Sequence, residues 1–536
     1  MSVLLSPHAS RSWLAAVSAL SLMAVSSLAQ AQTPPPPHPA QAEAAKVAEQ
    51  DLATLQARLI AGETTSEALV RAYLYRIGTL DQSGPGLNSV LSINPDALTQ
   101  ARALDAERKA GKVRGPLHGL PVLLKDNIET LDPLPTTAGS LALKDNVTGR
   151  DAPVAARLRA AGAIVLGKTN LSEWANIRSP RSSSGWSALG GQTRNAYSLA
   201  HSPCGSSSGS GTATAASLAG ASVGTETDGS IVCPSAMNGL VGIKPTVGLV
   251  SRTHIVPISH SQDTAGPMTR TVRDAALMLT AMAGTDPMDP ATKDADARKG
   301  DYTLALKSDA LKGVRLGVMR PLTGYSKETD AVFEAGLKTL QAQGAVLVEI
   351  TEALPRNEMG AAEFQILLSE LKTDLGTYLA STDPKQVPVR SLKDVIAFNL
   401  AHPHALMFFG QEFFDLAEAT EGTSGEAYAK AVETARRLSR TEGIDALRAK
   451  HKVAALIAPT TGPAWKIDPV KGDDYSGSAS SLAAVAGYPH ITVPMGQVNG
   501  LPVGLSFFAE AWSEARLIGL AYSFEQAAKA RTAPTY

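Results

Sequence analysis

Short apolar runs alternate with amphipathic stretches along most of the chain. An amphipathic stretch at residues 154–161 directly precedes the apolar run 163–166, and residues 330–343 precede the run 345–350 in the same way. Apolar positions at helical spacing, followed by a short continuous apolar run, indicate a helix followed by a buried strand. Repetition of this unit predicts a layered α/β fold with a mostly buried sheet. The runs that we predict to be strands are residues 120–124, 163–166, 314–319, 345–350, 453–458 and 491–493.

Helical spacing of apolar residues also predicts several helices outside these units. Residues 41–62 and 64–80 are expected to form two amphipathic helices, and residues 96–108 a third. A long segment from about 355 to 450 is polar and helix-rich, which indicates an insertion or cap over the sheet. No further linker is evident after residue 45, so we expect residues 45–536 to form one large domain.

The N-terminus has the pattern of a secretory signal peptide. Arg11 supplies a positive flank, residues 13–28 are largely apolar, and Ala29-Gln30-Ala31 offers small residues for cleavage. We therefore predict a signal peptide at residues 1–31 and a stiff proline-rich spacer at residues 32–44. The mature protein is expected in the periplasm or outside the cell, with no membrane attachment after the signal is cleaved.

Composition excludes some classes of partner. The chain of 536 residues has a formal net charge of −1, and only 5% of its residues are aromatic. A nucleic-acid-binding protein needs a basic surface, and single-stranded bases need aromatic side chains to stack on. We therefore expect no nucleic-acid partner. The hydrophobic fraction of 44% is sufficient for a large core.

The chain has two cysteines, Cys204 and Cys233. An oxidising compartment permits a disulfide bond, but two cysteines do not make a disulfide framework. Each cysteine lies inside a motif rich in small residues, and the simpler interpretation is two small buried side chains. The sequence leaves their pairing open.

Two motifs match well-known patterns in an unsuitable context. Residues 162–169 fit the phosphate-loop pattern GxxxxGK[ST], but the middle of this segment is itself a predicted strand and cannot curl around a phosphate. Residues 205–209 fit the nucleophile-elbow pattern GxSxG, which would make Ser207 the nucleophile of a histidine-dependent esterase. That pattern requires a preceding strand, and Pro203 argues against one there.

Other isolated matches carry less weight. Ser369-Glu370-Leu371-Lys372 fits SxxK but lies in a helical stretch without the companion motifs, so we expect an exposed helix face. None of the ten histidines belongs to an HExxH motif, and the sequence supports no metal site. His254 and His260 are most simply loop residues or hydrogen-bonded core residues.

Three segments together could activate a serine without histidine. Lys125 ends an apolar run, where burial would lower its pKa and make it a base. Ser206 lies in the Gly/Ser-rich stretch 204–211, between segments that both look core-forming, unlike a flexible linker. Ser230 follows a glycine, and such a turn can direct backbone amides at a developing oxyanion. Each feature alone also fits a solvated lysine, a linker or a turn serine, whereas the ordered combination favours a catalytic site.

At these residues the chain resembles the amidase signature family. The resemblance covers roughly residues 45–530, and residues 202–210 and 225–234 look most like bacterial peptide amidases, which hydrolyse the C-terminal amide of peptides. The segments that carry the resemblance are Lys125-Asp126-Asn127, Gly167-Lys168-Thr169-Asn170, residues 204–211, residues 229–234, Gly242-Ile243-Lys244-Pro245-Thr246, residues 263–267, Ala458-Pro459-Thr460 and residues 487–505.

The resemblance implies the amidase signature fold, in which a mixed β-sheet is sandwiched between helices, and a Ser–Ser–Lys triad. Ser230 would attack the amide carbonyl, Ser206 would pass on the proton, and Lys125 would accept it. A cis peptide bond is implied between Gly205 and Ser206. No cofactor and no metal ion are implied. The oxyanion would bind to the backbone amides of Thr227, Asp228, Gly229 and Ser230.

The activity implied by the resemblance is that of a secreted serine amidohydrolase. It would cleave linear carboxamides to an acid plus ammonia or an amine, with peptide C-terminal amides as the expected substrates. The partner is then a small-molecule or peptide amide, while the acyl group, the leaving amine and the oligomeric state are not specified. Cys204 and Ser208 replace glycines of the usual loop, and Asp228 replaces a glycine of the oxyanion turn, so its role stays open.

Three other functions fit parts of the same pattern. One is an amidase of this family that acts on aryl or aliphatic amides. Another is the glutamine amidotransferase subunit of the family, against which the signal peptide and the lack of a basic surface weigh. The last is a catalytically silent binding protein on the same scaffold, against which the presence of Lys125, Ser206 and Ser230 weighs.

Overall fold

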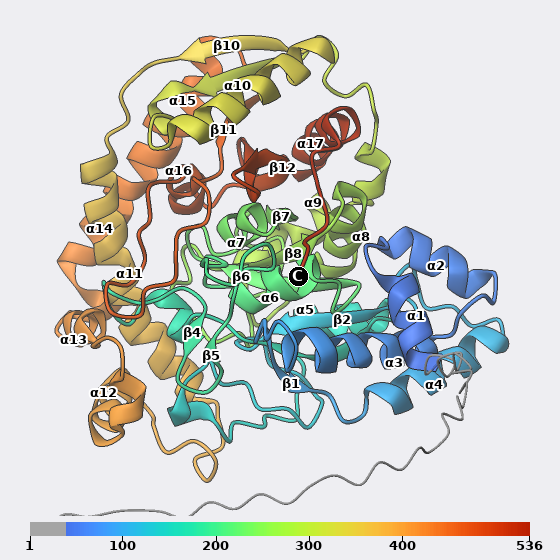
Figure 1. Ribbon diagram of the computed structural model, residues 1–536. Helices are drawn as coiled ribbons and strands as arrows, with labels where there is room; N and C mark the ends of the chain where they lie inside the picture. Colours follow the sequence, from blue (N-terminus) through green and yellow to red (C-terminus); the bar gives the residue numbers. More distant parts are fainter. Residues whose placement is uncertain (1–38) are drawn as a thin grey trace, which may run out of the picture. The chain divides into compact units, whose positions relative to one another are not determined.

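A mixed β-sheet of eleven strands runs through the described part of the protein (Figure 1). The computed structural model describes residues 39–536, so the predicted signal peptide at 1–31 and residues 32–38 of the predicted spacer lie outside the described residues. The strand order is β1-β3-β2-β6-β8-β7-β12-β13-β11-β9-β10. The strands are β1 (Val90–Ile93), β2 (Pro121–Lys125), β3 (Ile164–Thr169), β6 (Ala221–Glu226), β7 (Val241–Lys244), β8 (Thr264–Thr269), β9 (Arg315–Met319), β10 (Val346–Ile350), β11 (Ala455–Pro459), β12 (His490–Val498) and β13 (Leu501–Phe508), with β4 (Trp186–Ser187) and β5 (Gly191–Gln192) in a separate pair.

The sheet combines parallel and antiparallel pairs, as the expected fold class requires. Strand β2 pairs in parallel with β3 and β6, and β9 pairs in parallel with β10 and β11. The strands between these two groups, from β6 through β8, β7, β12 and β13 to β11, pair antiparallel. The prediction of an α/β fold with a mixed sheet is therefore confirmed.

All six predicted strands are present, as β2, β3, β9, β10, β11 and β12. The apolar pattern missed β6, β7 and β8, although every residue of these strands is buried. The sequences of β6 and β8, ASVGTE and TAGPMT, are rich in small and hydroxyl-bearing residues, and β7, VGIK, is short and contains a glycine and a lysine. A continuous apolar run indicates a strand by its large side chains. These central strands interrupt such runs with Gly224, Gly242 and Gly266, where neighbouring atoms leave no room for a side chain.

The helices begin and end near their predicted limits with one clear exception. Residues 41–62 form two helices rather than one, because the first helix ends at Val47 and a new one begins after Asp51. The Asp51 carboxylate caps the second helix by accepting a hydrogen bond from the Thr54 amide. The helices are α1 (Pro39–Val47), α2 (Leu52–Ile60), α3 (Ser66–Arg76), α4 (Ala97–Lys109), α5 (Pro153–Ala160), α6 (Ser208–Ala215), α7 (Val232–Met237), α8 (Val272–Met282), α9 (Ala295–Arg298), α10 (Lys327–Ala342), α11 (Arg356–Ala380), α12 (Leu392–Ala401), α13 (Glu412–Glu418), α14 (Glu426–Arg436), α15 (Asp445–His451), α16 (Ser480–Ala486) and α17 (Glu514–Ala528).

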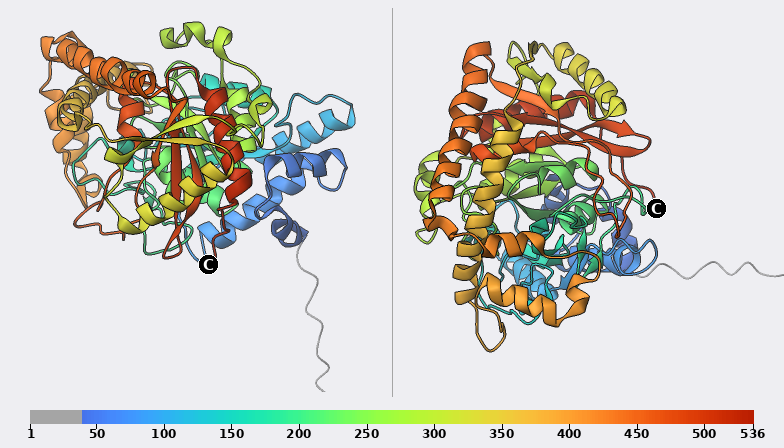
Figure 2. Two further views of the ribbon diagram at one scale, coloured as in Figure 1. Left: turned by 90° about the horizontal axis from the view of Figure 1, so that it is seen from above. Right: turned by 90° about the vertical axis from the view of Figure 1, so that its left-hand side faces the viewer.

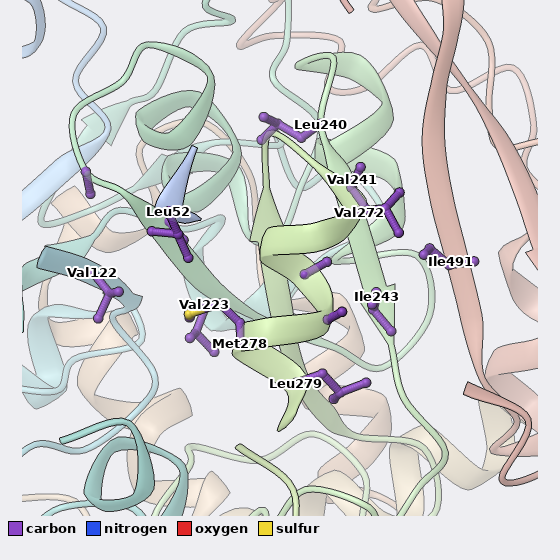
Figure 3. Packing of buried hydrophobic residues seen from close by; sticks show 14 of the residues in the cluster. Leu52, Val122, Val223, Leu240, Val241, Ile243, Val272, Met278, Leu279 and Ile491 are labelled. Atoms are coloured by element: carbon purple, nitrogen blue, oxygen red, sulfur yellow. The ribbon is translucent and has the colours of Figure 1, made fainter. Parts of the chain in front are cut away.

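Helices cover both faces of the central strands. Val241 and Ile243 of β7 belong to the same buried cluster as Val272 and Leu279 of α8 (Figure 3). A side chain at Gly242, between them, would instead strike Ser235 of α7. Because successive residues of a strand face opposite sides, α7 and α8 lie on opposite faces of the sheet. The sheet is therefore sandwiched between helices.

The segment predicted to be helix-rich contains α11 to α14 and most of α15. In two views α11, α12, α13 and α14 group together on the side away from α1 to α4 (Figures 1 and 2). Helix α11 contributes Leu368, Leu371 and Leu375 to a buried cluster of its own, with Trp174 from the core and Phe414 from α13. This cluster fixes α11 against the loops that follow β3. Within residues 39–536, no helix is both long and apolar enough to cross a membrane.

Candidate active site

The candidate residues meet at one edge of the sheet because of the strand order. Strand β2 ends at Lys125, and its parallel neighbour β6 ends at Glu226. The carboxyl ends of adjacent parallel strands lie at the same edge, where α/β proteins commonly bind ligands. The turn 227–230 follows β6 directly, and the loop that contains Ser206 leads into α6, which packs on both strands.

Lys125 is completely buried, and its amine lies among three oxygen atoms. The Lys125 Nζ atom donates to Ser206 Oγ at 2.8 Å, to Thr225 Oγ1 at 2.9 Å and to the Thr225 carbonyl oxygen at 3.2 Å. Burial lowers the pKa of Lys125 to about 7, while the charges of Asp263 and Glu226 act in the opposite direction. A substantial fraction of this amine is therefore neutral near pH 7 and can act as a base.

A neutral amine has two hydrogens and one lone pair for these three neighbours. The Thr225 carbonyl can only accept a hydrogen bond, so it takes one N–H. With the second N–H on Thr225 Oγ1, which also accepts from Asn127 Nδ2 at 2.9 Å, the lone pair faces Ser206 Oγ. This arrangement allows the amine to take a proton from Ser206.

Ser206 is fully buried and follows the Gly205–Ser206 peptide bond, which is cis as the family resemblance implied. Its carbonyl oxygen accepts from the Ser172 amide, and the next amide, that of Ser207, donates to the Ser230 carbonyl oxygen at 3.2 Å. The loop of Ser206 is thereby joined directly to the turn of Ser230.

Ser230 lies at the surface of a cavity of about 680 Å³. Its exposed fraction is 8%, whereas Ser206 and Lys125 are inaccessible and are not among the residues that line the cavity. Ser230 is therefore accessible from the cavity, whereas the Ser206–Lys125 pair is enclosed by the protein. Within residues 39–536, the Ser230 hydroxyl has no hydrogen-bond partner, which leaves it free to meet a ligand.

The turn before Ser230 presents unused backbone N–H groups. Within the described residues, the amides of positions 227, 228, 229 and 230 donate no hydrogen bond. Buried N–H groups are normally paired, so four consecutive free donors beside a cavity indicate a site for an anionic or carbonyl oxygen. Gly229 has φ +79°, a conformation that disfavours residues with a side chain.

Two buried carboxylates hold this turn in place. Glu226 Oε2 accepts from the amides of Ile231 and Val232 at 2.7 and 2.9 Å, which fixes the start of α7. At the start of the turn, the Asp263 carboxylate accepts a hydrogen bond from the Thr227 hydroxyl at 2.6 Å. Asp263 belongs to one of the segments that carry the family resemblance but had no predicted role, and neither Thr225 nor Glu226 was predicted to act in the site. Their function depends on contacts that no local pattern records.

Cys204 and Cys233 form a disulfide bond, contrary to the simpler interpretation of two unpaired buried side chains. The bond joins the loop two residues before Ser206 to α7 three residues after Ser230. Both cysteines line the cavity. They were 29 positions apart in sequence, and only the folded arrangement of loop and helix brings them together.

The misleading motifs have structural roles. Ser207 is fully buried, and its hydroxyl both donates to and accepts from the backbone of Thr225, so it does not reach the cavity. The strand predicted at residues 163–166 extends as β3 to Thr169 and includes Lys168, whose amine donates to the Ile128 carbonyl oxygen at 2.6 Å. The expectation of an exposed face at Ser369 was wrong, because this side of α11 is covered and Ser369 is 1% exposed.

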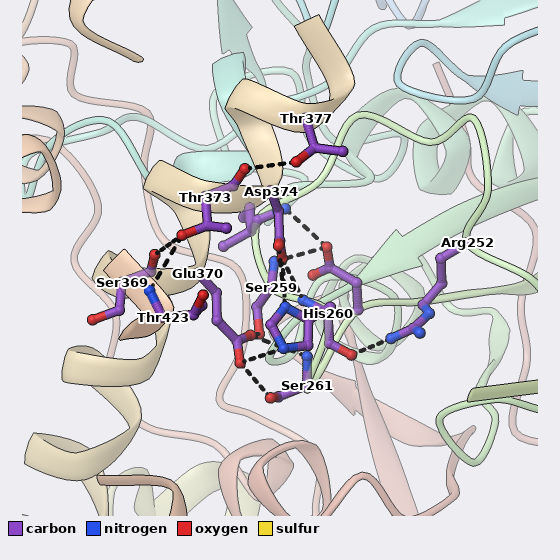
Figure 4. A network of polar contacts seen from close by, with 12 residues as sticks. Arg252, Ser259, His260, Ser261, Ser369, Glu370, Thr373, Asp374, Thr377 and Thr423 are labelled. Atoms are coloured by element: carbon purple, nitrogen blue, oxygen red, sulfur yellow. Dashed lines mark hydrogen bonds and ion pairs between the residues drawn. The ribbon is translucent and has the colours of Figure 1, made fainter. Parts of the chain in front are cut away.

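His260 does not line the main cavity but fastens α11 to the loop between β7 and β8 (Figure 4). Its Nδ1 atom lies 2.8 Å from Asp374 Oδ2, and its Nε2 atom lies 3.2 Å from Glu370 Oε1. These three residues are spaced closely enough to hold a metal ion. However, Glu370 already accepts hydrogen bonds from Ser259, Ser261 and Tyr428. The geometry is that of an imidazole held between two carboxylates. His254 lies in a second cavity of about 360 Å³.

Comparisons with known proteins agree with this geometry. The family model described as Amidase matches residues 68–518. A probable amidase of Arabidopsis thaliana is 43% identical over 484 residues, which cover 88% of this chain and 88% of the relative. The native peptide amidase of Stenotrophomonas maltophilia is 53% identical with a TM-score of 0.87, and the match covers 91% of this chain and 99% of that one. Peptide amidase PAM in complex with the competitive inhibitor chymostatin is 54% identical with a TM-score of 0.88, over 92% of this chain and 100% of that one.

Proposed function

Because this chain belongs to the amidase family, we propose that it hydrolyses the C-terminal amides of peptides through a Ser230–Ser206–Lys125 triad. That it is an enzyme which hydrolyses amides follows from the family and from its amidase relatives. The substrate class and the residue roles are the proposal. The observation that supports the residue roles is the buried hydrogen bond between Lys125 Nζ and Ser206 Oγ, in a loop whose next amide, that of Ser207, bonds to the backbone of the cavity-lining Ser230.

Acylation begins when Ser230 Oγ attacks the carbonyl carbon of the amide. The proton of Ser230 passes to Ser206, and the proton of Ser206 passes to the lone pair of Lys125. The negative oxygen of the tetrahedral intermediate accepts hydrogen bonds from the unused amides of residues 227–230. Removal of one such donor typically costs about 3 kcal/mol of transition-state stabilisation.

Collapse of the intermediate breaks the carbon–nitrogen bond. The proton held by Lys125 returns through Ser206 to the leaving nitrogen, and ammonia departs when the substrate is a primary amide. Water then attacks the ester of Ser230, the same groups carry its proton, and the acid is released with Ser230 restored. The cycle needs a neutral lysine at rest, which the buried position of Lys125 supplies.

Peptide amides are favoured as substrates by the shape of the cavity and by its relatives. The cavity of about 680 Å³ is large enough for several residues of a peptide. Apolar side chains of α11, such as Met359 and Leu367, form one wall, and Trp465 and Tyr475 contribute to another. The inhibitor-bound relative is a peptide amidase.

Export to an oxidising compartment is part of the proposal. It is supported by the charged and apolar pattern of residues 1–31 and by the disulfide between Cys204 and Cys233, a bond that persists in such compartments. Expression of the full chain in a Gram-negative host, followed by fractionation and sequencing of the mature N-terminus, tests it. A periplasmic protein that begins at Gln32 is expected, and a cytoplasmic protein with residues 1–31 intact would contradict export.

The substrate is tested by offering the purified enzyme matched peptide amides, aryl amides and fatty amides and measuring the ammonia or amine released. We expect the highest kcat/KM for peptide amides. A preference for aryl or fatty amides would leave amide hydrolysis intact but replace the substrate class. A serine-directed phosphonofluoridate, mapped by mass spectrometry, should label Ser230, and labelling at Ser207 instead would overturn the assigned nucleophile.

A further inference from the structure

Two carboxyl groups face the cavity beside the proposed nucleophile. Asp228 lies in the turn two residues before Ser230, and Glu363 projects from α11 with an exposed fraction of 9%. Gln262 connects them, because its Nε2 atom donates to the Thr227 carbonyl oxygen at 3.3 Å and to Glu363 Oε1 at 2.9 Å. One amide side chain therefore spans the distance from the turn to Glu363.

Each of these carboxyl groups keeps an oxygen without a donor. Asp228 Oδ2 accepts from the Ser481 hydroxyl at 2.6 Å, but Asp228 Oδ1 is buried without a hydrogen-bond partner. Glu363 Oε1 is occupied by Gln262, and Glu363 Oε2 accepts no hydrogen bond within residues 39–536. A buried carboxylate oxygen is normally satisfied, so the unpaired Asp228 Oδ1, in the same cavity as a Glu363 Oε2 that accepts no hydrogen bond from the described residues, indicates a donor that arrives with a ligand.

The described part of the protein places no paired cation beside these carboxyl groups. Among the described residues, no lysine or arginine forms an ion pair with Asp228 or Glu363. Lys244 is the cation whose charge favours ionised Asp228, and it is shared with Glu226 and Glu514. Arg356 lines the cavity but is exposed and donates to the Pro321 carbonyl oxygen.

A third carboxyl group of the same cavity, that of Asp473, has hydrogen-bond donors from the protein. Asp473 accepts from the Ser184 amide and hydroxyl and from Trp465 Nε1. Its oxygens are thus occupied by protein donors, in contrast to those of Asp228 and Glu363. The free oxygens of this pair are a local property and are not shared by all acidic residues of the cavity.

We propose that Asp228 and Glu363 bind a cationic nitrogen group of the acyl part of the substrate, an ammonium or a guanidinium, and so select amides that carry one. The proposal rests on the function proposed above. Two sources of the cation are possible: the free α-ammonium of an amino-acid amide, or a basic side chain of the residue that bears the amide. After hydrolysis, the same carboxyl groups repel the new carboxylate and favour its release.

The ionisation of the pair is consistent with this role. Burial raises the pKa of Glu363 to about 8, and the neighbouring charge of Asp228 adds to the effect. Burial also raises the pKa of Asp228, although Ser480 and Ser481 oppose the shift. A bound cation would replace the proton that the pair otherwise retains.

The test uses pairs of substrates that differ only in charge. N-acetyl-alanyl-lysinamide is compared with N-acetyl-alanyl-norleucinamide for the basic side chain, and leucinamide with N-acetyl-leucinamide for the α-ammonium. The kcat/KM for ammonia release is measured at pH 7 for the wild type and for Glu363→Gln. In at least one pair we expect the wild type to favour the cationic member by about tenfold or more, and Glu363→Gln to remove most of that preference.

Glu358→Gln provides the matched control. It removes the same charge from the same helix, but Glu358 is 59% exposed, pairs with Arg437 and does not line the cavity. The Glu358→Gln variant should prefer the cationic member of each substrate pair to the same extent as the wild type. Stoichiometric labelling of Ser230 by the phosphonofluoridate shows that each variant is folded and has an intact site.

The outcomes separate this inference from the proposed function. Equal kcat/KM for both members of each pair in the wild type, or a preference that Glu363→Gln leaves unchanged, overturns the cation subsite while peptide-amide hydrolysis stands. No ammonia from any member of either pair overturns the proposed substrate class itself.

Discussion

The amine of Lys125 and the hydroxyl of Ser206 lie 2.8 Å apart in a part of the protein that solvent does not reach. Their positions in the chain differ by 81 residues. Burial has two effects on this pair. It lowers the pKa of the lysine to about 7, and it excludes water that would compete for the hydrogen bond.

Replacement of Lys125 by alanine should remove the general base. We expect kcat/KM for a peptide amide to fall by about 10²- to 10⁴-fold, the usual contribution of such a base. Lys125→Arg should be similarly impaired, because a guanidinium stays protonated. Ammonia release measures the loss, and thermal unfolding verifies that the variants are folded. Wild-type activity in either variant would exclude Lys125 as the base.

Activity should depend on pH through the same amine. Only the neutral lysine can accept a proton, and its pKa is lowered to about 7. The kcat/KM is therefore expected to fall about tenfold for each pH unit well below 7, and to level off above it. A pH–rate profile with a neutral peptide amide tests this. A profile that is flat from pH 5 to 9 would contradict a titrating lysine base.

Gly229→Ala should impair the oxyanion turn more than the fold. The φ angle of +79° disfavours alanine, and the new Cβ atom would lie 3.1 Å from Ser480 Oγ. We expect a stability loss of about 1–2 kcal/mol and a fall in kcat of about 10- to 100-fold with a smaller change in KM. Steady-state kinetics and urea unfolding separate the two effects. A KM increase with unchanged kcat would argue against an oxyanion role.

Removal of the disulfide should destabilise the protein. A bond between cysteines 29 positions apart typically contributes about 3.6 kcal/mol by restricting the unfolded chain. The double variant Cys204→Ala/Cys233→Ala is expected to unfold at lower temperature and at lower denaturant concentration. Reduction of the wild type with dithiothreitol should reproduce the loss. Reductant should have no effect on the double variant, which serves as the control.

The His260 contact should stabilise the protein more at low pH than at high pH. Hydrogen bonding to Asp374 and the charge of Glu370 raise the pKa of His260, against burial and the charge of Arg252. Tyr428, which faces the ring from α14, donates to Glu370. A raised histidine pKa adds stability that is fully present below about 6.5, the unfolded value, and is lost as pH rises through the folded value.

His260→Gln should therefore lower Tm more at pH 5.5 than at pH 9. Because the side chain is 49% exposed, solvent screening limits the effect to about 1 kcal/mol or less. Thermal unfolding of the wild type and the variant at both pH values measures the difference. An equal or larger effect at pH 9 would show that the imidazolium is not what holds α11 to the loop.

Local patterns predicted β2, which ends at Lys125, but missed β6, β8 and β7, the next strands in the centre of the sheet. Apolar runs identified β9, β10 and β11, which include large buried side chains such as Leu316, Ile350 and Leu456. They did not identify β6, which leads into the oxyanion turn, because its residues 221–226 are small or polar. At Gly224 an added Cβ atom would lie 2.8 Å from Ser207 Oγ. Close approach of the loop excludes the large apolar residues that make a strand recognisable.

The sequence by itself determined the alternation of helices and buried strands and the position of the helix-rich segment, because periodicity and residue type are local properties. It also predicted, through the family resemblance, the three side chains of the proposed triad. Only the tertiary structure decided that Lys125 is inaccessible and lies against Ser206, that Cys204 and Cys233 pair, and that Asp228 and Glu363 share one cavity. The physical reason is that desolvation and long-range pairing depend on which distant segments pack together, and sequence spacing does not encode this directly.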